Sequence, residues 1–337
     1  MTLPASVQGG PKNFSVRQFG MGFAHGKIIL LGEHAVVYGA PALALPVPGL
    51  TVTAKAVLSS RPSGHPGDAT FTMAGIVPAP APVETGETLR RIVVDFKKTT
   101  GIKVDTPIDI VIDSGIPAGR GLGSSAACAR SVVLALADLF GRQLNPGTIF
   151  DLVQAAENLT HGRASGIDTL ATGSSTPVLL TGGVTREPEV EIDGIFVIGD
   201  SGEVGRTNEA VGMLRRRFQR DPQAQEEFLA RVSTLTSLAV RDLADGQAGN
   251  FGARMIACHA ALREAGLSTD RIDTLVGVAL TAGSLGAKIS GGGLGGCVIA
   301  LADRPERAQE ISSRLLGAGA ERTWTVPVGR FARHGHS

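Results

Sequence analysis

The sequence predicts an α+β protein of two domains, and three observations support this prediction. The chain has 337 residues, which is long enough for two domains that share one cleft. Strand-like and helix-like patterns occur together in both halves. Around residues 184–195 the pattern relaxes into a polar stretch that contains Gly and Pro. We therefore expect an N-terminal domain over residues 21–187 and a C-terminal domain over 188–330, with a flexible, polar arm over residues 1–20.

The first half contains two predicted strands and two predicted helices. Residues 51–57 and 108–113 alternate polar and apolar side chains, which is typical of half-buried strands. Residues 124–140 carry Ala, Val and Leu throughout and predict one buried helix. Asn145 followed by Pro146 is a helix start, and it predicts a helix through residue 159. Between the strands, residues 59–88 are rich in Gly, Pro and Ser, so we expect an irregular excursion that is either a mobile flap or a variable surface loop.

The second half predicts a similar mixture of elements. Strands are expected over residues 196–198, 276–280 and 297–301. Helices are expected over about 223–242, 251–265 and 306–316. A Gly-rich turn at residues 291–293 is expected to join a helical segment to the strand that starts at Cys297.

Composition and charge exclude several classes of partner. There are 32 Lys and Arg residues against 31 Asp and Glu, so the chain lacks the basic surplus of a nucleic-acid-binding protein. The run Arg215–Arg217 is interpreted as a solvated helix face. The cysteines Cys128, Cys258 and Cys297 form no CxxC pair, which indicates reduced thiols in a cytoplasmic protein. No apolar run approaches the roughly 18 residues that span a bilayer, so no membrane partner is expected.

The strongest local motif is residues 116–127, IPAGRGLGSSAA. A strand ends here, a loop with three glycines follows, and a helix begins. Backbone N–H groups converge in such a loop, and the helix N-terminus adds further N–H groups and a positive dipole end, which together suit a di- or triphosphate. Ser124 and Ser125 can cap the helix or offer hydroxyls to phosphate or Mg²⁺. No Gly-Lys-Ser/Thr follows, so this is not a P-loop, and a simple Gly-rich turn before a capped helix is the alternative.

This motif resembles the ATP-binding motif of the GHMP kinases. Two further segments resemble that superfamily, residues 26–39 (GKIILLGEHAVVYG) and residues 288–297 (KISGGGLGGC). The three segments occur in the expected order and cover the chain from about residue 20 to residue 300. The resemblance implies an ATP-dependent small-molecule kinase with a two-domain fold. Its N-terminal domain would be like domain 2 of ribosomal protein S5, its C-terminal domain would be ferredoxin-like, and the active site would lie between them.

A fourth segment, residues 157–168 (ENLTHGRASGID), resembles the mevalonate kinase pattern within that superfamily. It implies transfer of the γ-phosphate of ATP to the 5-hydroxyl of (R)-mevalonate. Another GHMP kinase such as a phosphomevalonate kinase, and a non-catalytic ligand sensor on the same fold, remain alternatives. A homodimer is expected by analogy only, and feedback inhibition by isoprenoid diphosphates stays open.

The resemblance also implies residue roles. It assigns catalysis to Asp168 and Lys27, substrate contacts to Glu33, His34 and Ser165, ATP contacts to Gly119, Gly121, Leu122, Gly123, Ser124, Ser125, Thr207, Gly291 and Gly292, and Mg²⁺ to Ser125 and Glu157. A carboxylate such as that of Asp168 is a weak base for an alcohol, so it would mainly orient the hydroxyl and accept its proton late. Lys27 would keep Asp168 ionised and offset charge on the γ-phosphate. His161, before Gly162, is interpreted as a structural residue at a helix end, and Cys128 and Cys297 as core fillers.

Overall fold

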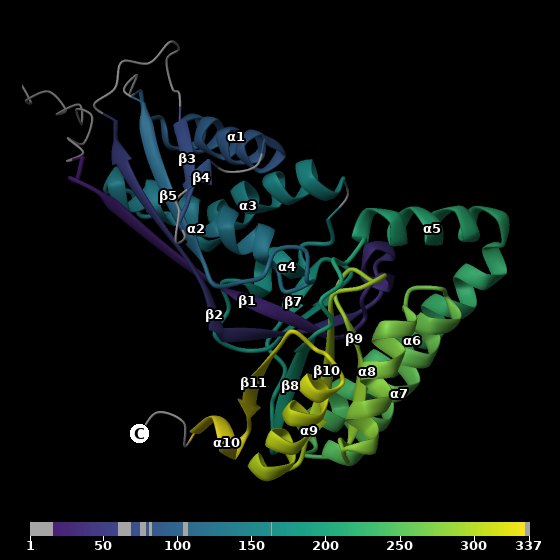
Figure 1. The fold of residues 1–337 in the computed structure, drawn as a ribbon. Helices are drawn as coiled ribbons and strands as arrows, with labels where there is room; N and C mark the ends of the chain where they lie inside the picture. The colour runs from purple at the N-terminus through teal and green to yellow at the C-terminus, as the bar shows by residue number, and fades with distance from the viewer. Residues whose placement is uncertain are drawn as a thin grey trace, which may run out of the picture.

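The computed structural model describes residues 16–59, 69–74, 79–80, 83–103, 107–162 and 164–333. It contains two sheets, each covered by helices, in adjacent parts of the molecule (Figure 1). Most of the predicted N-terminal arm lies outside the described residues. At its described end, the backbone N–H of Arg17 donates to the Leu139 carbonyl.

The first sheet holds the N-terminal half of the chain. Its strands are β1 (Gly20–Leu31), β2 (Ala42–Leu58), β3 (Ala69–Met73), β4 (Ala79–Pro80), β5 (Ile108–Ser114), β6 (Val178–Thr181) and β7 (Val184–Arg186). They run in the order β4-β3-β5-β2-β6-β7, with β1 paired to β2 in a long antiparallel ribbon. The helices of this half are α1 (Val83–Thr100), α2 (Ser124–Leu139), α3 (Pro146–His161) and the short α4 (Ile167–Ala171).

Close packing of β1 against α2 explains two glycines. A Cβ atom at Gly22 would lie 1.9 Å from the Ser131 carbonyl oxygen, and one at Gly20 would lie 2.1 Å from that of Ala135. Side chains at these positions would force the strand away from the helix. The predicted buried helix is confirmed in α2, whose apolar residues are buried almost throughout.

The expectation of an irregular segment over residues 59–88 is wrong for its described part. β3 pairs with β5 in parallel, and its Phe71 side chain is buried, so tertiary pairing orders this stretch. Helix α1 then begins at Val83. Residues 60–68, 75–78 and 81–82 lie outside the described residues. The prediction of either a flap or a surface loop falls on these residues.

The second sheet has the ferredoxin-like arrangement that the resemblance implied. Its strands are β8 (Gly194–Asp200), β9 (Gly286–Ser290), β10 (Cys297–Ala302) and β11 (Arg322–Val328), in the order β11-β8-β10-β9 with antiparallel pairing. The last strand therefore lies beside the first. The helices are α5 (Thr207–Arg220), α6 (Pro222–Ala244), α7 (Ala248–Glu264), α8 (Asp270–Thr281), α9 (Pro305–Gly317) and α10 (Arg330–Arg333).

Two predictions in this half are wrong. Residues 276–280 belong to helix α8 rather than to a strand, because Thr269 caps the helix by accepting from the Ile272 N–H and because Ile272, Leu275, Val276 and Ala279 form one buried face at helical spacing. The Gly-rich turn does not follow a helix. It joins β9 to β10 as a hairpin.

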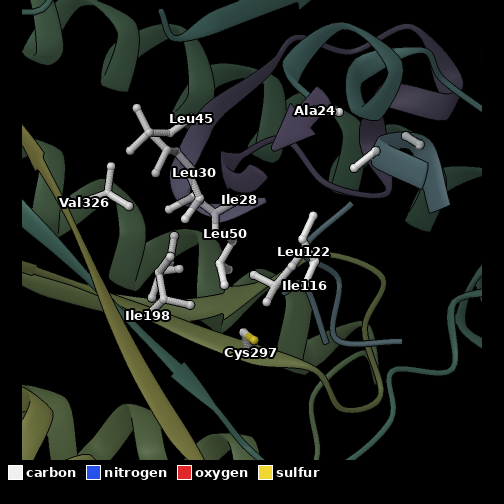
Figure 2. Packing of buried hydrophobic residues seen from close by; sticks show 14 of the residues in the cluster. Ala24, Ile28, Leu30, Leu45, Leu50, Ile116, Leu122, Ile198, Cys297 and Val326 are labelled. Atoms are coloured by element: carbon white, nitrogen blue, oxygen red, sulfur yellow. The ribbon is translucent and has the colours of Figure 1, made fainter. Parts of the chain in front are cut away.

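The two domains share a continuous apolar core. Figure 2 shows Ile28 and Leu50 of the first domain close to Ile198 and Cys297 of the second. Cys297 is fully buried there, and Cys128 packs against the same cluster, as expected for core fillers. Because the interface is apolar, it fixes the two domains relative to each other and gives the cleft between them a defined shape.

No helix in the described part of the chain is both long enough and apolar enough to cross a membrane.

Candidate active site

A cleft of about 760 Å³ lies where the two domains meet. Of the residues predicted for the site, those that line it are Lys27, Glu33, His34, Gly119, Gly121, Gly123, Ser124, Ser125, Glu157, Ser165, Asp168, Thr207, Gly291 and Gly292. Leu122 is the exception. Its side chain is buried in the core, and its carbonyl accepts a hydrogen bond from the Lys27 N–H. The structure thus brings together residues from opposite ends of the chain.

The nucleotide loop, residues 116–123, presents backbone to the cleft. Gly119, Gly121 and Gly123 have φ angles of 70°, 73° and 75°, a left-handed conformation that favours glycine. A Cβ atom on Gly291, in the β9–β10 hairpin, would lie 2.7 Å from the Gly121 Cα, so the two Gly-rich loops touch along their backbones. No side chain of a described residue caps the start of α2, contrary to the capping role considered for Ser124 and Ser125. The first-turn N–H groups of α2 are therefore available to an anion.

Lys27 and Asp168 form an ion pair at the base of the cleft. The Lys27 Nζ lies 2.9 Å from the Asp168 Oδ2 and donates to the Gly121 carbonyl at 3.1 Å. The Lys27 side chain is 2% exposed, whereas that of Asp168 is 37% exposed. A buried cation thus holds a carboxylate that is open to the cleft, directly beneath the nucleotide loop.

Glu157, on α3, has the environment of a cation ligand. Its Oε1 atom is buried and has no hydrogen-bond partner among the residues that the structure describes. Burial and the negative charge of Asp168 raise the pKa of Glu157 to about 7, while a hydrogen bond from Ser125 and the charge of Lys27 act in the opposite direction. A divalent cation would relieve the repulsion between the two carboxylates, so Glu157 and Ser125 fit Mg²⁺.

No three His, Cys, Asp or Glu side chains gather as a metal-binding group among the residues that the structure describes. In kinases, Mg²⁺ usually takes only one or two ligands from the protein.

His161 is closer to the cleft than its structural interpretation implied. It ends α3, and Gly162 occupies the C-cap position, as predicted. However, its ring lines the cleft, and its Nε2 lies 3.9 Å from the Glu157 Oε2. Burial is the main cause of its lowered pKa, which favours a neutral imidazole beside the candidate metal ligand.

Glu33 forms a buried ion pair with Lys288 that the sequence did not reveal. Lys288, on β9, is fully buried and also donates to the Ile289 carbonyl at 2.5 Å. Its Nζ contacts the Glu33 Oε1, while the Glu33 Oε2 is buried and finds no hydrogen-bond partner within the described ranges. Lys288 is the first residue of the motif at residues 288–297, but no local pattern indicates that its partner lies 255 positions away.

His34 is neutral and strained beside this pair. Its φ angle is 64°, which is unusual for a residue other than glycine. Burial, and secondarily the charge of Lys288, lower its pKa from 6.5 to about 4. Its Nε2 atom is buried, and no hydrogen-bond partner for it lies in the described part of the chain.

The lowered pKa of His34 predicts a stability loss in acid. Between pH 6.5 and pH 4 the unfolded chain takes up a proton at residue 34 before the folded chain does, so stability falls as the pH is lowered through this window. At pH 5 the loss is expected to be on the order of 1–2 kcal/mol. Urea unfolding of the wild type and of His34→Gln at pH 7.5 and pH 5 measures it. The prediction fails if both proteins lose stability equally.

The far end of the cleft combines apolar side chains with one arginine. Val36, Val37 and Tyr38 of the 3-10 turn η1 (Ala35–Tyr38) line it together with Val211 and Arg215 of α5. Arg215 was predicted to lie on a solvated face. It is exposed, but it faces the cleft, and its guanidinium has no ion-pair partner within the described ranges.

The fold and the site together define the class of protein. The family model described as GHMP kinases N terminal domain matches residues 87–175, and the model described as GHMP kinases C terminal matches residues 239–321. The two matches fall in the two domains seen in the structure. The expected two-domain GHMP kinase fold is therefore present.

Full-length relatives narrow the class. The chain is 32% identical to the mevalonate kinase of Thermococcus onnurineus over 88% of its own length and 92% of the relative's. The mevalonate kinase from methicillin-resistant Staphylococcus aureus MRSA252 is 28% identical and has a TM-score of 0.69 over 93% of this chain and 100% of that chain. L. major mevalonate kinase in complex with R-mevalonate shares the fold at a TM-score of 0.77 and 22% identity, over 93% of this chain and 98% of that chain. The chain belongs to the mevalonate kinase family of the GHMP kinases, which are ATP-dependent small-molecule kinases.

Proposed function

We propose that the protein transfers the γ-phosphate of ATP to the 5-hydroxyl of (R)-mevalonate and releases 5-phosphomevalonate and ADP. The observation that carries the proposal is the Lys27–Asp168 ion pair, at 2.9 Å, directly beneath the nucleotide loop. A phosphate held at the start of α2 would lie next to this pair. A hydroxyl placed beside Asp168 could then attack it in line.

Asp168 and Lys27 have complementary roles in this reaction. Phosphoryl transfer passes through a loose transition state, so positioning and charge neutralisation dominate catalysis. The exposed Asp168 carboxylate accepts a hydrogen bond from the 5-hydroxyl, orients it, and takes its proton as the P–O bond forms. Lys27 holds Asp168 through their ion pair and offsets the charge on the transferred group.

Glu157 and Ser125 are the residues that would hold Mg²⁺. When bound, the ion would offset the negative charge of the ATP phosphates. Glu157 must lose its proton to serve as a ligand. Because its pKa is about 7, this deprotonation falls within the physiological pH range.

The remaining residues of the cleft suit a small aliphatic carboxylate. We place the methyl-bearing carbon of mevalonate against Val36, Val37 and Val211, and its carboxylate near Arg215. Glu33 and His34 would contact the 3-hydroxyl, and Ser165 lies at the same cleft. The free cysteines among the described residues support a reducing, cytoplasmic location.

Arg215→Gln is expected to raise the KM for mevalonate by about 10- to 100-fold, because a hydrogen bond to a charged group contributes about 1.5–3 kcal/mol. The KM for ATP should change little. Steady-state kinetics with each substrate varied in turn measures both values. Arg216→Gln, the next residue on α5, does not line the cleft and is the matched control. Equal effects of the two variants would contradict the placement of the carboxylate.

The assay that tests the proposed function is coupled ADP release with Mg-ATP. Mevalonate, phosphomevalonate, galactose and homoserine serve as candidate acceptors. Turnover on mevalonate at about 1–100 per second is expected. Turnover on phosphomevalonate instead would favour a phosphomevalonate kinase. ATP binding without turnover on any acceptor would favour a ligand sensor.

A further inference from the structure

The nucleotide loop contains one charged residue, Arg120, between Gly119 and Gly121. An arginine within a phosphate-binding loop is ordinarily assigned to the phosphates, because its guanidinium matches their geometry. The structure places this side chain differently. Gly119, Gly121 and Gly123 line the cleft, whereas Arg120 does not.

Arg120 points into the second domain. Its Nε atom lies 2.8 Å from the Oδ1 atom of Asp200, at the end of β8, and the two side chains are 12% and 2% exposed. Asp200 is itself held in place, since its Oδ1 accepts a hydrogen bond from the Gly202 N–H at 3.0 Å. A second carboxylate, that of Glu321, lies 3.4 Å from the Arg120 Nη2 but is 57% exposed.

The rest of the loop meets the second domain through backbone atoms. The Gly119 carbonyl accepts from the Gly205 N–H at 2.7 Å, and Gly121 lies against the Ser290–Gly291 backbone. Arg120 adds a charged side-chain anchor between these two backbone contacts. A loop with three glycines in the left-handed region has much conformational freedom to lose when a ligand binds. A contact that fixes the loop before ATP binds lowers the conformational entropy that the loop loses on binding.

We propose that Arg120 is a positioning residue, and that its ion pair with Asp200 holds the nucleotide loop in the conformation that binds the ATP phosphates. The pair is nearly buried, where charges interact more strongly than at the surface. The inference rests on the proposed function only in taking ATP as the ligand of this loop.

The test compares Arg120→Gln, Asp200→Asn and the double variant. ATP affinity is measured by equilibrium titration with a fluorescent ATP analogue and Mg²⁺, without any acceptor. Both single variants are expected to weaken ATP binding by about 10- to 100-fold, the scale of misplacing a binding group by about an ångström. The double variant should be no weaker than the worse single variant, because both remove the same interaction. The KM for mevalonate, measured under saturating Mg-ATP, should stay within about twofold, because the mevalonate side of the cleft is not altered.

Glu321→Gln is the matched control, because it removes the exposed partner of the same guanidinium. It is expected to leave ATP affinity unchanged. Thermal melts establish that each variant is folded at the assay temperature. If Arg120→Gln does not fold, the ATP affinity of the near-isosteric Asp200→Asn tests the proposal by itself.

Three results would overturn the proposal. ATP affinity unchanged in Asp200→Asn would show that the pair does not position the loop. Loss in Arg120→Gln with none in Asp200→Asn would make Arg120 a direct phosphate ligand. Additive losses in the double variant would mean that the two residues act separately. A wild type that binds ATP but does not phosphorylate mevalonate would refute the proposed function and leave this test intact.

Discussion

Asp168→Asn is expected to lower kcat by about 10²- to 10⁴-fold, the range attributed to a positioned general base. Asparagine keeps the size of the side chain but cannot take the hydroxyl proton. It also leaves Lys27, which is 2% exposed, without its ionic partner at 2.9 Å. The KM for ATP should change little, because Lys27 stays next to the nucleotide loop and can still face the γ-phosphate. Coupled ADP release under saturating Mg-ATP and mevalonate measures kcat.

The matched control for this variant is Asp151→Asn, an exposed aspartate on α3. It should leave kcat unchanged. A kcat in Asp168→Asn within about tenfold of the wild type would remove Asp168 from the role of base. Single-turnover measurements then show whether product release, rather than chemistry, limits the rate.

Lys288→Met is expected to destabilise the protein by about 3–5 kcal/mol, the usual result of removing one partner from a buried ion pair. Lys288 is fully buried, and Glu33 is 4% exposed. Without the ammonium group, the Glu33 carboxylate would be left charged in the core, or would have to take up a proton. Urea unfolding at pH 7.5 measures the loss as a shift of the midpoint.

Glu33→Gln in the Lys288→Met background separates stability from binding. The neutral amide removes the stranded charge, so the double variant should recover much of the lost stability. It should not recover the KM for mevalonate, because Glu33 also lines the cleft. Lys103→Met, which removes an exposed lysine just after α1, is the control and should cost less than about 0.5 kcal/mol. A loss below about 1 kcal/mol in Lys288→Met would show that the pair is not a buried charge pair in solution.

The parts of the candidate site that are formed by adjacent residues could be predicted from the sequence. Gly119, Gly121 and Gly123, followed by the start of a helix, indicate an anion-binding loop because the required backbone conformation is encoded in a few adjacent residues. The segments that contain Lys27 and Asp168 were recognised by resemblance, and the structure brings both to one cleft with 2.9 Å between their charged atoms. The buried helix α2 was likewise evident from its composition.

The wrong predictions of secondary structure fall where the local sequence pattern and the tertiary contacts favour different structures. Residues 276–280 contain alternating valines that suit a strand, yet the Thr269 cap and the buried face of α8 make them helical. The order of the described part of residues 59–88 comes from pairing of β3 with β5. A pattern read within a short window does not contain the partner that decides the outcome.

By itself, the sequence determined the two-domain α+β class. It also predicted the nucleotide loop and the candidate catalytic pair of Lys27 and Asp168, because each prediction depends on residues that are adjacent or on a recognised motif. The tertiary structure alone decided which side chains those motifs contact. It paired Glu33 with Lys288 across 255 positions, turned Arg120 away from the cleft toward Asp200, and brought Arg215 from an apparently solvated run to the cleft wall. The physical reason is that burial and ion pairing depend on distances between segments that only the packed chain brings together.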